Sequence, residues 1–248
     1  MTLRNMGLIF YDISDYPHAL KHYGTALKIV REIQSRDDEA MLLSDIGDVY
    51  NNLGEYERAQ KYYEDSLKVA EDIKSKRLAC FTLVSLADLF MNLNQRDKAK
   101  AFLDKAYQDA EGSKERLQSV LACFCDYYLE EGNLNKFTET MAVIDDLFKE
   151  EKTKNFEGDI NILLGRYYGS VNEYHKAEEY FQKALAIYTE LKEQLSIGKT
   201  YYYWGCMEKD KGSKTIAQEK LQNALNIFSI LGVNGWKIHT ENMMKTWQ

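Results

Sequence analysis

The sequence predicts an all-α chain, built as a solenoid of six helix-turn-helix repeats and followed by one C-terminal capping helix. The first observation behind this prediction is a residue pattern that recurs six times, in steps of 40, 40, 38, 40 and 40 residues. A fixed period of this length is the signature of stacked structural repeats. The second observation is the single proline among 248 residues, which suits long helices because proline interrupts helix interiors.

Each copy of the pattern holds mostly small residues at three positions. The first position is occupied by Gly7, Gly47, Ala87, Cys125, Gly165 and Gly205. Twelve residues later come Ala19, Ala59, Ala99, Phe137, Ala177 and Ala217. Seven residues further on are Ala26, Ser66, Ala106, Ile144, Ala184 and Ala224. Small residues let helix axes approach closely, and the bulky residues between these positions would fill the layer.

The second repeat shows why each copy is interpreted as two helices. Apolar residues recur at helical spacing up to Leu53, and Gly54 follows as a C-terminal cap because glycine accepts a left-handed backbone. A second apolar stripe runs from Tyr56 to Ile73. We therefore expect two antiparallel helices in each repeat, over about residues 1–37, 38–77, 78–115, 116–155, 156–195 and 196–232.

Two places depart from the pattern. Phe137 stands at the expected crossing point of the fourth helix pair, so we expect it to push the helices apart and alter the local curvature; drift at a tolerant position is the alternative. Residues 233–248 are predicted to form a capping helix that starts at Asn234 as its N-cap. Its apolar face would carry Trp236, His239, Met243 and Trp247. A helix that docks another protein is the alternative.

Charge and composition narrow the class of function. The net charge of −7 argues against binding to nucleic acid or anionic membranes, which requires a basic surface. No apolar run approaches the roughly 20 residues of a membrane span, and the N-terminus lacks a signal peptide, so a cytoplasmic location is expected. The four cysteines form no CxxC pair and are expected to be reduced.

The sequence offers no constellation of catalytic or metal-binding residues. His18 and His22 have a spacing that could hold a metal, but no acidic or cysteine partner follows in register, so a surface pair is expected. No glycine-rich phosphate loop is present. We therefore expect neither enzymatic activity nor a cofactor.

The six copies resemble the tetratricopeptide repeat family. The matching residues are the small residues above, the aromatic residues between them, and Leu3, Leu43, Leu83, Leu121 and Asn161. The repeats are longer than the family's usual 34 residues and lack its closing proline; similar long repeats occur in kinesin light chains, spindle-orientation adaptors and bacterial peptide-pheromone regulators. The resemblance implies a right-handed superhelix in which the first helix of each repeat lines a concave face.

The resemblance also implies which residues on that face bind a partner. They are Arg4, Tyr11, Ser44, Asp48, Asn51, Asn52, Asp88, Met91, Asn92, Asp126, Arg166, Tyr202 and Lys209. The aspartates at 48, 88 and 126 would suit basic side chains, and asparagine amides would suit the backbone of an extended peptide. Alternatively, these aspartates are solvated or pair with lysines within the stack.

The leading hypothesis is a non-catalytic adaptor or scaffold that binds a peptide or partner helix in the groove. The partner would be a protein or peptide, with basic side chains favoured, and neither nucleic acid nor a membrane; a homodimer through the terminal repeats is an open alternative. A second hypothesis is a ligand-sensing module of a larger signalling protein, such as a transcription regulator, an ATPase or a cyclase. It rests on a chain that starts almost inside its first helix.

Overall fold

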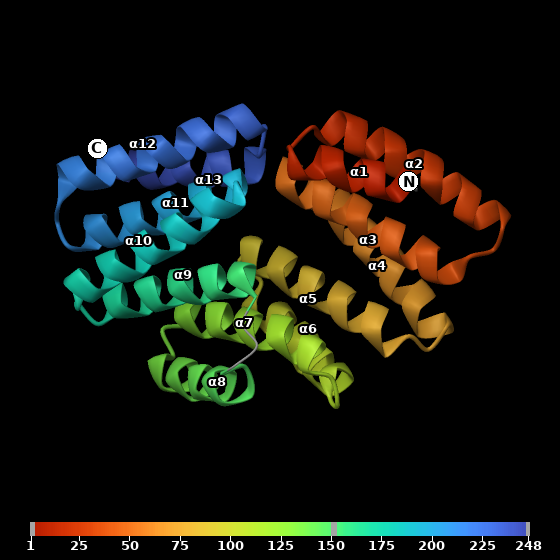
Figure 1. The fold of residues 1–248 in the computed structure, drawn as a ribbon, viewed down its shortest axis with the longest axis horizontal. Coiled ribbons are helices and arrows are strands. Elements are labelled where there is room, and N and C mark those ends of the chain that lie inside the picture. Colours follow the sequence, from red (N-terminus) through yellow and green to blue (C-terminus); the bar gives the residue numbers. More distant parts are fainter. Residues whose placement is uncertain (1–2, 150–152, 247–248) are drawn as a thin grey trace. The chain divides into compact units, whose positions relative to one another are not determined.

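The computed structural model describes residues 3–149 and 153–246, and within them it contains thirteen α-helices and no strand (Figure 1). The helices are α1 (Leu3–Asp12), α2 (Tyr16–Glu32), α3 (Arg36–Leu53), α4 (Tyr56–Asp72), α5 (Lys76–Asn92), α6 (Arg96–Ala110), α7 (Lys114–Glu130), α8 (Leu134–Leu147), α9 (Lys154–Ser170), α10 (Tyr174–Leu191), α11 (Gln194–Asp210), α12 (Lys214–Leu231) and α13 (Asn234–Lys245). The predicted all-α class is confirmed.

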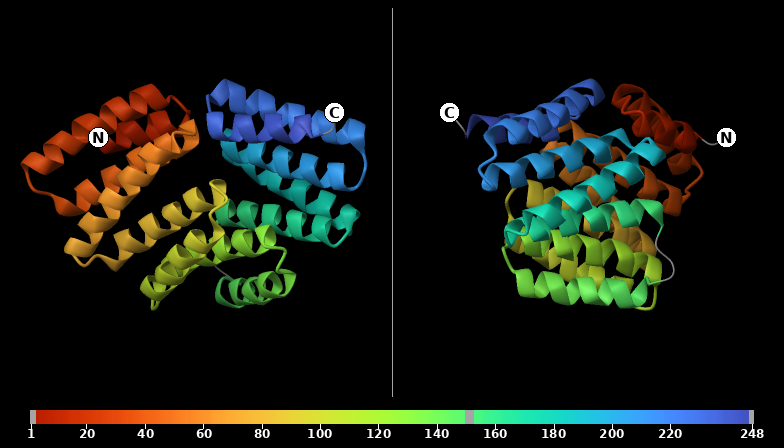
Figure 2. Two further views of the ribbon diagram at one scale, coloured as in Figure 1. Left: turned by 180° about the vertical axis from the view of Figure 1, so that it is seen from behind. Right: turned by 60° about the vertical axis from the view of Figure 1, so that its left-hand side comes forward.

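The chain divides into two compact units, Met1–Tyr127 and Tyr128–Gln248, called here the N-terminal and the C-terminal unit. In the N-terminal unit each helix from α1 to α5 packs on the next, and α3 also packs on α5. In the C-terminal unit each helix from α9 to α12 packs on the next, and α11 also packs on α9 and α13. Successive hairpins within each unit therefore lie side by side (Figure 2).

A residue with positive φ stands in nearly every turn that the structure describes. Within the helix pairs these residues are Ser14, Gly54, Asn94, Gly132, Asn172 and Gly212. Between the pairs they are Gln34, Lys74, Gly112, Lys192 and Gly232. Gly54, with φ of 76°, ends α3 and donates its backbone N–H to Tyr50 and Asn51, as predicted. The turn geometry thus repeats with the sequence period even where the residue is not glycine.

The glycines of the first small position touch a bulky side chain four residues after the second small position. A Cβ atom added to Gly47 would lie 2.6 Å from the ring of Tyr63, and one added to Gly165 would lie 2.7 Å from the ring of Phe181. Both rings are buried. The small residue is therefore needed because a large ring of the paired helix occupies the space of its side chain.

A second close approach occurs in the C-terminal unit and was missed in the sequence analysis. A Cβ atom on Gly158 would lie 2.6 Å from Tyr188, and one on Gly198 would lie 2.7 Å from Phe228. At the equivalent positions of the second and third repeats the residues are Ala40, Ala70, Cys80 and Ala110, all buried. The N-terminal unit thus pairs two small residues where the C-terminal unit pairs a glycine with an aromatic ring.

Phe137 of α8 is buried, with 1% of its surface exposed. Its ring stacks on that of Tyr167 in α9, with centroids 4.9 Å apart and an angle of 15° between the planes. The side chain that replaces the usual alanine therefore fills space against the next helix. The expected change of curvature stays a prediction.

Helix α13 packs on α11 and α12. Trp236 makes most of the aromatic contacts, with ring centroids 5.4 Å from Tyr202 and 5.7 Å from Phe228. The predicted N-cap, Asn234, is wrong: Val233 is the N-cap residue, no side chain caps the helix, and Asn234 is its first residue. The reason is that the backbone oxygen of Val233 already accepts from Lys237. Trp247 lies outside the described residues.

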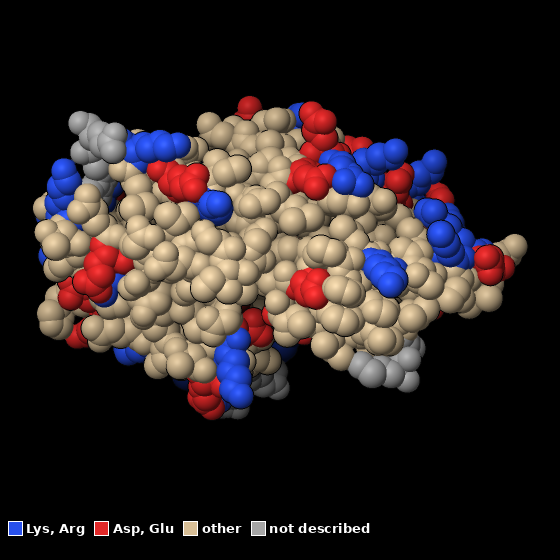
Figure 3. Space-filling view, turned by 90° about the horizontal axis from the view of Figure 1, so that it is seen from above, with Lys and Arg blue, Asp and Glu red and all other residues tan. Residues whose placement is uncertain are grey.

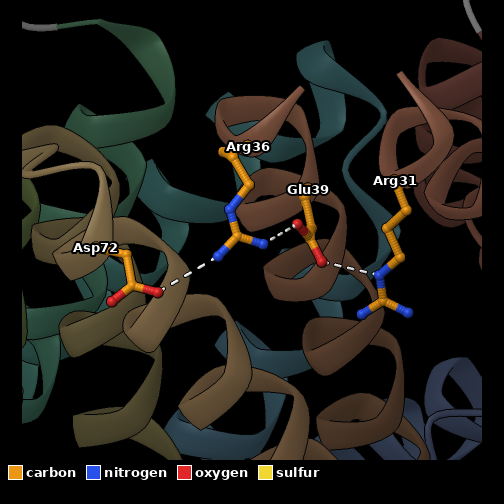
Figure 4. Close-up of polar contacts among 4 residues, drawn as sticks. All are labelled: Arg31, Arg36, Glu39 and Asp72. Atoms are coloured by element: carbon orange, nitrogen blue, oxygen red, sulfur yellow. Dashed lines mark hydrogen bonds and ion pairs between the residues drawn. The ribbon is translucent and has the colours of Figure 1, made fainter. Parts of the chain in front are cut away.

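A chain of ion pairs joins α2, α3 and α4 at one edge of the N-terminal unit (Figure 4). Glu39 accepts from Arg31 Nε at 2.8 Å and from Arg36 Nη1 at 2.5 Å, and Arg36 also reaches Asp72 at 3.4 Å. Glu39 is 7% exposed. Burial raises its pKa, but the hydrogen bonds and charges of the two arginines outweigh that effect and leave the pKa below its usual value.

We expect Glu39→Gln to lower the free energy of unfolding by about 1–2 kcal/mol at pH 7, a modest value because both arginines are half exposed. A carboxyl group with a lowered folded pKa stabilises above its unfolded pKa and loses that effect as the pH falls through its folded value. The difference from wild type, measured by urea unfolding, should therefore shrink below about pH 4. Glu32→Gln, at an exposed residue at the end of α2, serves as the control; an equal effect of both changes would contradict the prediction.

Candidate peptide-binding surface

The predicted binding residues of the N-terminal unit lie on α1, α3, α5 and α7, the first helices of their pairs. We call this set the first-helix surface of the N-terminal unit: Arg4, Tyr11, Ser44, Asp48, Asn51, Asn52, Asp88, Met91, Asn92 and Asp126. Of these, Asp88 is exposed and the others are half-buried. None of the helices that the structure describes is long and apolar enough to span a membrane.

Two contacts tie α1 to α3. Arg4 donates through Nε to Oδ2 of Asp45 at 2.6 Å and through Nη2 to Oδ1 at 3.1 Å, a two-pronged ion pair. Asn52 donates through Nδ2 to the hydroxyl oxygen of Tyr11 at 2.9 Å. The guanidinium of Arg4 is thus committed to Asp45, a residue that the sequence analysis did not single out.

Asp48 is a desolvated carboxyl group rather than a solvated one. Tyr63 of α4 donates its hydroxyl to Oδ1 of Asp48 at 2.7 Å, and Ser85 of α5 adds a further side-chain hydrogen bond. Burial raises the pKa of Asp48 to about 7, helped by the charges of Asp45 and Asp88 and opposed by the two hydrogen bonds. These contacts and the raised pKa argue against the alternative of a solvated Asp48, and its role in binding stays a prediction.

Asp88 gathers asparagine amides from two helices. Asn51 of α3 donates through Nδ2 to Oδ2 of Asp88 at 3.2 Å, and Asn92 of α5 donates to the same oxygen at 3.4 Å. The side-chain oxygen of Asn51 is buried and accepts no hydrogen bond. Three predicted binding residues on two consecutive first helices thus present one connected polar surface with an unused acceptor.

Asp88 and Asp126 both act electrostatically on the thiol of Cys123. Burial first, and then the charges of Asp88 and Asp126, raise the pKa of Cys123 well above its usual value. Ser44 and Met91 are half-buried on α3 and α5. Asp88 thus acts on both Asp48 and Cys123.

In the C-terminal unit the predicted cations are already engaged. Arg166 of α9 pairs with Glu130 at 2.5 Å, and its guanidinium carbon lies 4.1 Å from the ring centre of Tyr203. Only 10% of the Arg166 side chain is exposed. Lys209 donates to Thr246 Oγ1 at 2.6 Å and lies 3.3 Å from Met243 Sδ. Of these two partners of Lys209, Met243 lies on α13 and Thr246 directly follows that helix.

Tyr202 packs edge-on against Trp236, and its hydroxyl interacts with the thiol of Cys206. Lys199 lies 5.1 Å from the ring centre of Trp236. This part of the C-terminal unit is therefore a layer of aromatic rings with cations placed over them. The sequence analysis named Tyr202 as a binding residue, but it did not predict that the cations lie over Tyr203 and Trp236.

The face of the molecule seen in Figure 3 carries no patch of side chains with a single sign of charge. Lysine and arginine side chains are interspersed with aspartate and glutamate among uncharged residues there. The case for a partner therefore rests on the hydrogen-bonding residues.

Comparison with known families identifies the repeats. Family profiles described as tetratricopeptide repeat match residues 1–72, 38–112 and 163–191, together more than half of the chain. The chain belongs to the tetratricopeptide repeat family. A comparison with curated proteins gives no match.

Solved tetratricopeptide-type structures share the fold. The apo form of RapI has a TM-score of 0.77 and 15% identity, over 92% of this chain and 82% of that one. A Rap protein complexed with Competence and Sporulation Factor has a TM-score of 0.68 and 14% identity, over 98% and 73%. The sensor-containing signal transduction ATPase PH0952 of Pyrococcus horikoshii has a TM-score of 0.59 and 18% identity, over 96% of this chain and 36% of that protein. The predicted solenoid is confirmed.

Within this tetratricopeptide fold two of the histidines pack on an aromatic ring. The rings of His18 and His22 stack on Phe10 at centroid distances of 5.1 and 5.2 Å. Burial raises the pKa of Cys80 to about 11 and that of Cys206 to about 12, so these thiols stay protonated near pH 7. Among the described residues no three His, Cys, Asp or Glu side chains are grouped so as to hold a metal ion.

Proposed function

We propose that this tetratricopeptide repeat protein is a non-catalytic interaction module that binds a peptide or protein segment on the first-helix surface of its N-terminal unit. The observation that carries the proposal is the link from Asn51 to Asp88 and Asn92, which spans consecutive repeats. Amide groups can both donate and accept, so they suit the backbone of an extended chain. A Rap protein of the same fold is solved with Competence and Sporulation Factor, which supports a peptide as the ligand.

The preferred ligand would carry basic side chains. Asp88 is exposed, and Asp88 and Asp126 both act electrostatically on the thiol of Cys123, so two carboxyl groups lie around the same polar surface. A lysine or arginine of the ligand would be attracted there, most strongly at low ionic strength.

In the C-terminal unit we propose Arg166, Tyr202 and Lys209 as a second contact region. Arg166 is paired with Glu130, so an acidic group of a ligand would have to displace that carboxylate. We further propose that residues 1–232 form six repeats and that residues 233–248 cap them. A cytoplasmic location would suit the four free cysteines. As an alternative to binding another protein, the terminal repeats could self-associate.

We expect Asp88→Asn to weaken binding of a basic dodecapeptide about tenfold, equivalent to about 1.4 kcal/mol. Asn keeps the shape and one acceptor but removes the charge. Peptides selected from a mixed-charge array would be labelled, and their dissociation constants measured by fluorescence anisotropy at two salt concentrations. The loss should be smaller at high salt.

The matched control is Asp65→Asn, at an exposed aspartate of α4, which removes the same charge from a second helix. It should leave the affinity unchanged. The proposal fails if no peptide of the array binds, or if Asp65→Asn weakens binding as much as Asp88→Asn does.

A sensing module of a larger signalling protein is the second candidate. It is favoured by the likeness to PH0952, whose tetratricopeptide part is described as a sensor and of which this chain spans about a third. In that case ligand binding on the same surface would control the activity of another domain or protein. The gene neighbourhood would show which activity is controlled.

A further inference from the structure

The side chain of Asp48 stands where three helices of the N-terminal unit meet. It belongs to α3, it accepts a hydrogen bond from Tyr63 of α4 at 2.7 Å, and it interacts with Ser85 of α5. Helix α3 packs directly on both α4 and α5. The group therefore lies at the joint between the second and third helix pairs, and anything that changes its hydrogen bonding acts on that joint.

The charged neighbours of Asp48 make its ionised form costly. Asp45 on α3 and Asp88 on α5 are carboxylates, and both act on Asp48. The cation of this region, Arg4 on α1, is bound in two-pronged fashion by Asp45. The remaining titratable groups that face Asp48 are the phenols of Tyr11 on α1, Tyr23 on α2 and Tyr63 on α4. These phenols are neutral near pH 7.

We propose that Asp48 is a pH-responsive switch, which holds α3, α4 and α5 together while its carboxyl group is protonated and loosens this joint when it ionises. The protonated group accepts from Tyr63 and keeps a hydrogen to donate. The ionised group releases that proton to solvent and is held more strongly by the hydrogen bonds of Tyr63 and Ser85, but its burial and the repulsion from Asp45 and Asp88 outweigh this gain. The inference does not depend on the proposed ligand, since it concerns the unliganded joint.

The sign of the effect follows from the two states. The pKa of Asp48 is raised to about 7 in the folded chain, from an ordinary 3.8. The folded state therefore binds more protons than the unfolded state between these values, and opening of the joint becomes easier as the pH rises. Between pH 6 and pH 8 the opening equilibrium should increase roughly tenfold.

The experiment uses the full chain with ¹³C-labelled aspartate. The Cγ resonance of Asp48 is followed between pH 4 and 9, and hydrogen exchange of the α3–α5 amides is measured at pH 6 and 8, with protection corrected for the intrinsic exchange rate. We expect a titration midpoint near 7 and a roughly tenfold loss of protection at pH 8. Asp48→Asn, which cannot ionise, should show little pH dependence of protection.

Two further variants separate this effect from general changes. Asp88→Asn removes a repelling charge and should lower the midpoint of Asp48, whereas Asp65→Asn on α4 should leave it in place. A midpoint below 5 in the wild type overturns the proposal, whatever the variants do. So does protection that falls equally in the wild type and in Asp48→Asn.

Discussion

Gly165→Ala is expected to destabilise the protein by about 1–3 kcal/mol, although alanine is the better helix former. The added Cβ atom would lie 2.7 Å from the ring of Phe181, which is fully buried and stacks on Trp204 at 6.0 Å. The ring cannot swing out into solvent, so α9 and α10 would have to separate. Chemical denaturation followed by circular dichroism measures the loss.

The third repeat supplies the compensating pair. It holds Ala87 and Leu103 at the positions equivalent to Gly165 and Phe181, and both are fully buried. The double variant Gly165→Ala with Phe181→Leu should therefore recover most of the loss, in a clear departure from additivity. Gly24→Ala, where an added Cβ atom meets nothing within 4 Å, is the control and should be neutral or slightly stabilising. Equal destabilisation by both single glycine changes would refute the steric explanation.

Phe137→Ala should cost about 3–5 kcal/mol, even though it restores the residue found in the other five repeats. The ring is 1% exposed and stacks on Tyr167 at 4.9 Å, so its removal leaves a cavity between α8 and α9. A purely pattern-based view expects the opposite, since alanine is the usual residue there. Thermal and urea unfolding distinguish the two expectations.

Met141→Leu provides the control for this repeat. Met141 is buried on α8, and the third and sixth repeats carry Leu103 and Leu221 at the equivalent position. A swap that conserves volume should cost less than about 1.5 kcal/mol. If Phe137→Ala proved as mild as Met141→Leu, the ring would not be filling essential space.

The fold could be predicted from the sequence because small residues recur with its period, and they recur for a steric reason: a bulky side chain of the paired helix fills the space beside them. It did not indicate the turn conformations at Ser14, Gln34 or Lys74, because these residues adopt positive φ only when the flanking helices dictate it. The pairing of Gly158 with Tyr188 was also missed. Gly158 and Tyr188 stand where the second repeat has Ala40 and Ala70, so each residue, considered by itself, departs from the repeat pattern.

The candidate site was only partly predictable for a related reason. The resemblance to the tetratricopeptide repeat family was enough to place Asp48, Asn51 and Asp88 on one face. It could not show that Tyr63, taken as a filler of the layer, donates its hydroxyl to Asp48. The first repeat keeps the tyrosine as Tyr23 but has Leu8 in place of the aspartate, and the third repeat has Leu103 in place of the tyrosine, so this bond belongs to one repeat and not to the pattern.

The neighbour-to-neighbour packing of the helices has a consequence for how the chain is made. In the N-terminal unit each helix from α1 to α5 packs on the next one in sequence, and α3 also packs on α5. Contacts so close along the chain require little loop closure, which favours rapid folding. Each hairpin that emerges from the ribosome can therefore dock at once on the hairpin made before it, and its apolar stripe is covered before the next one appears.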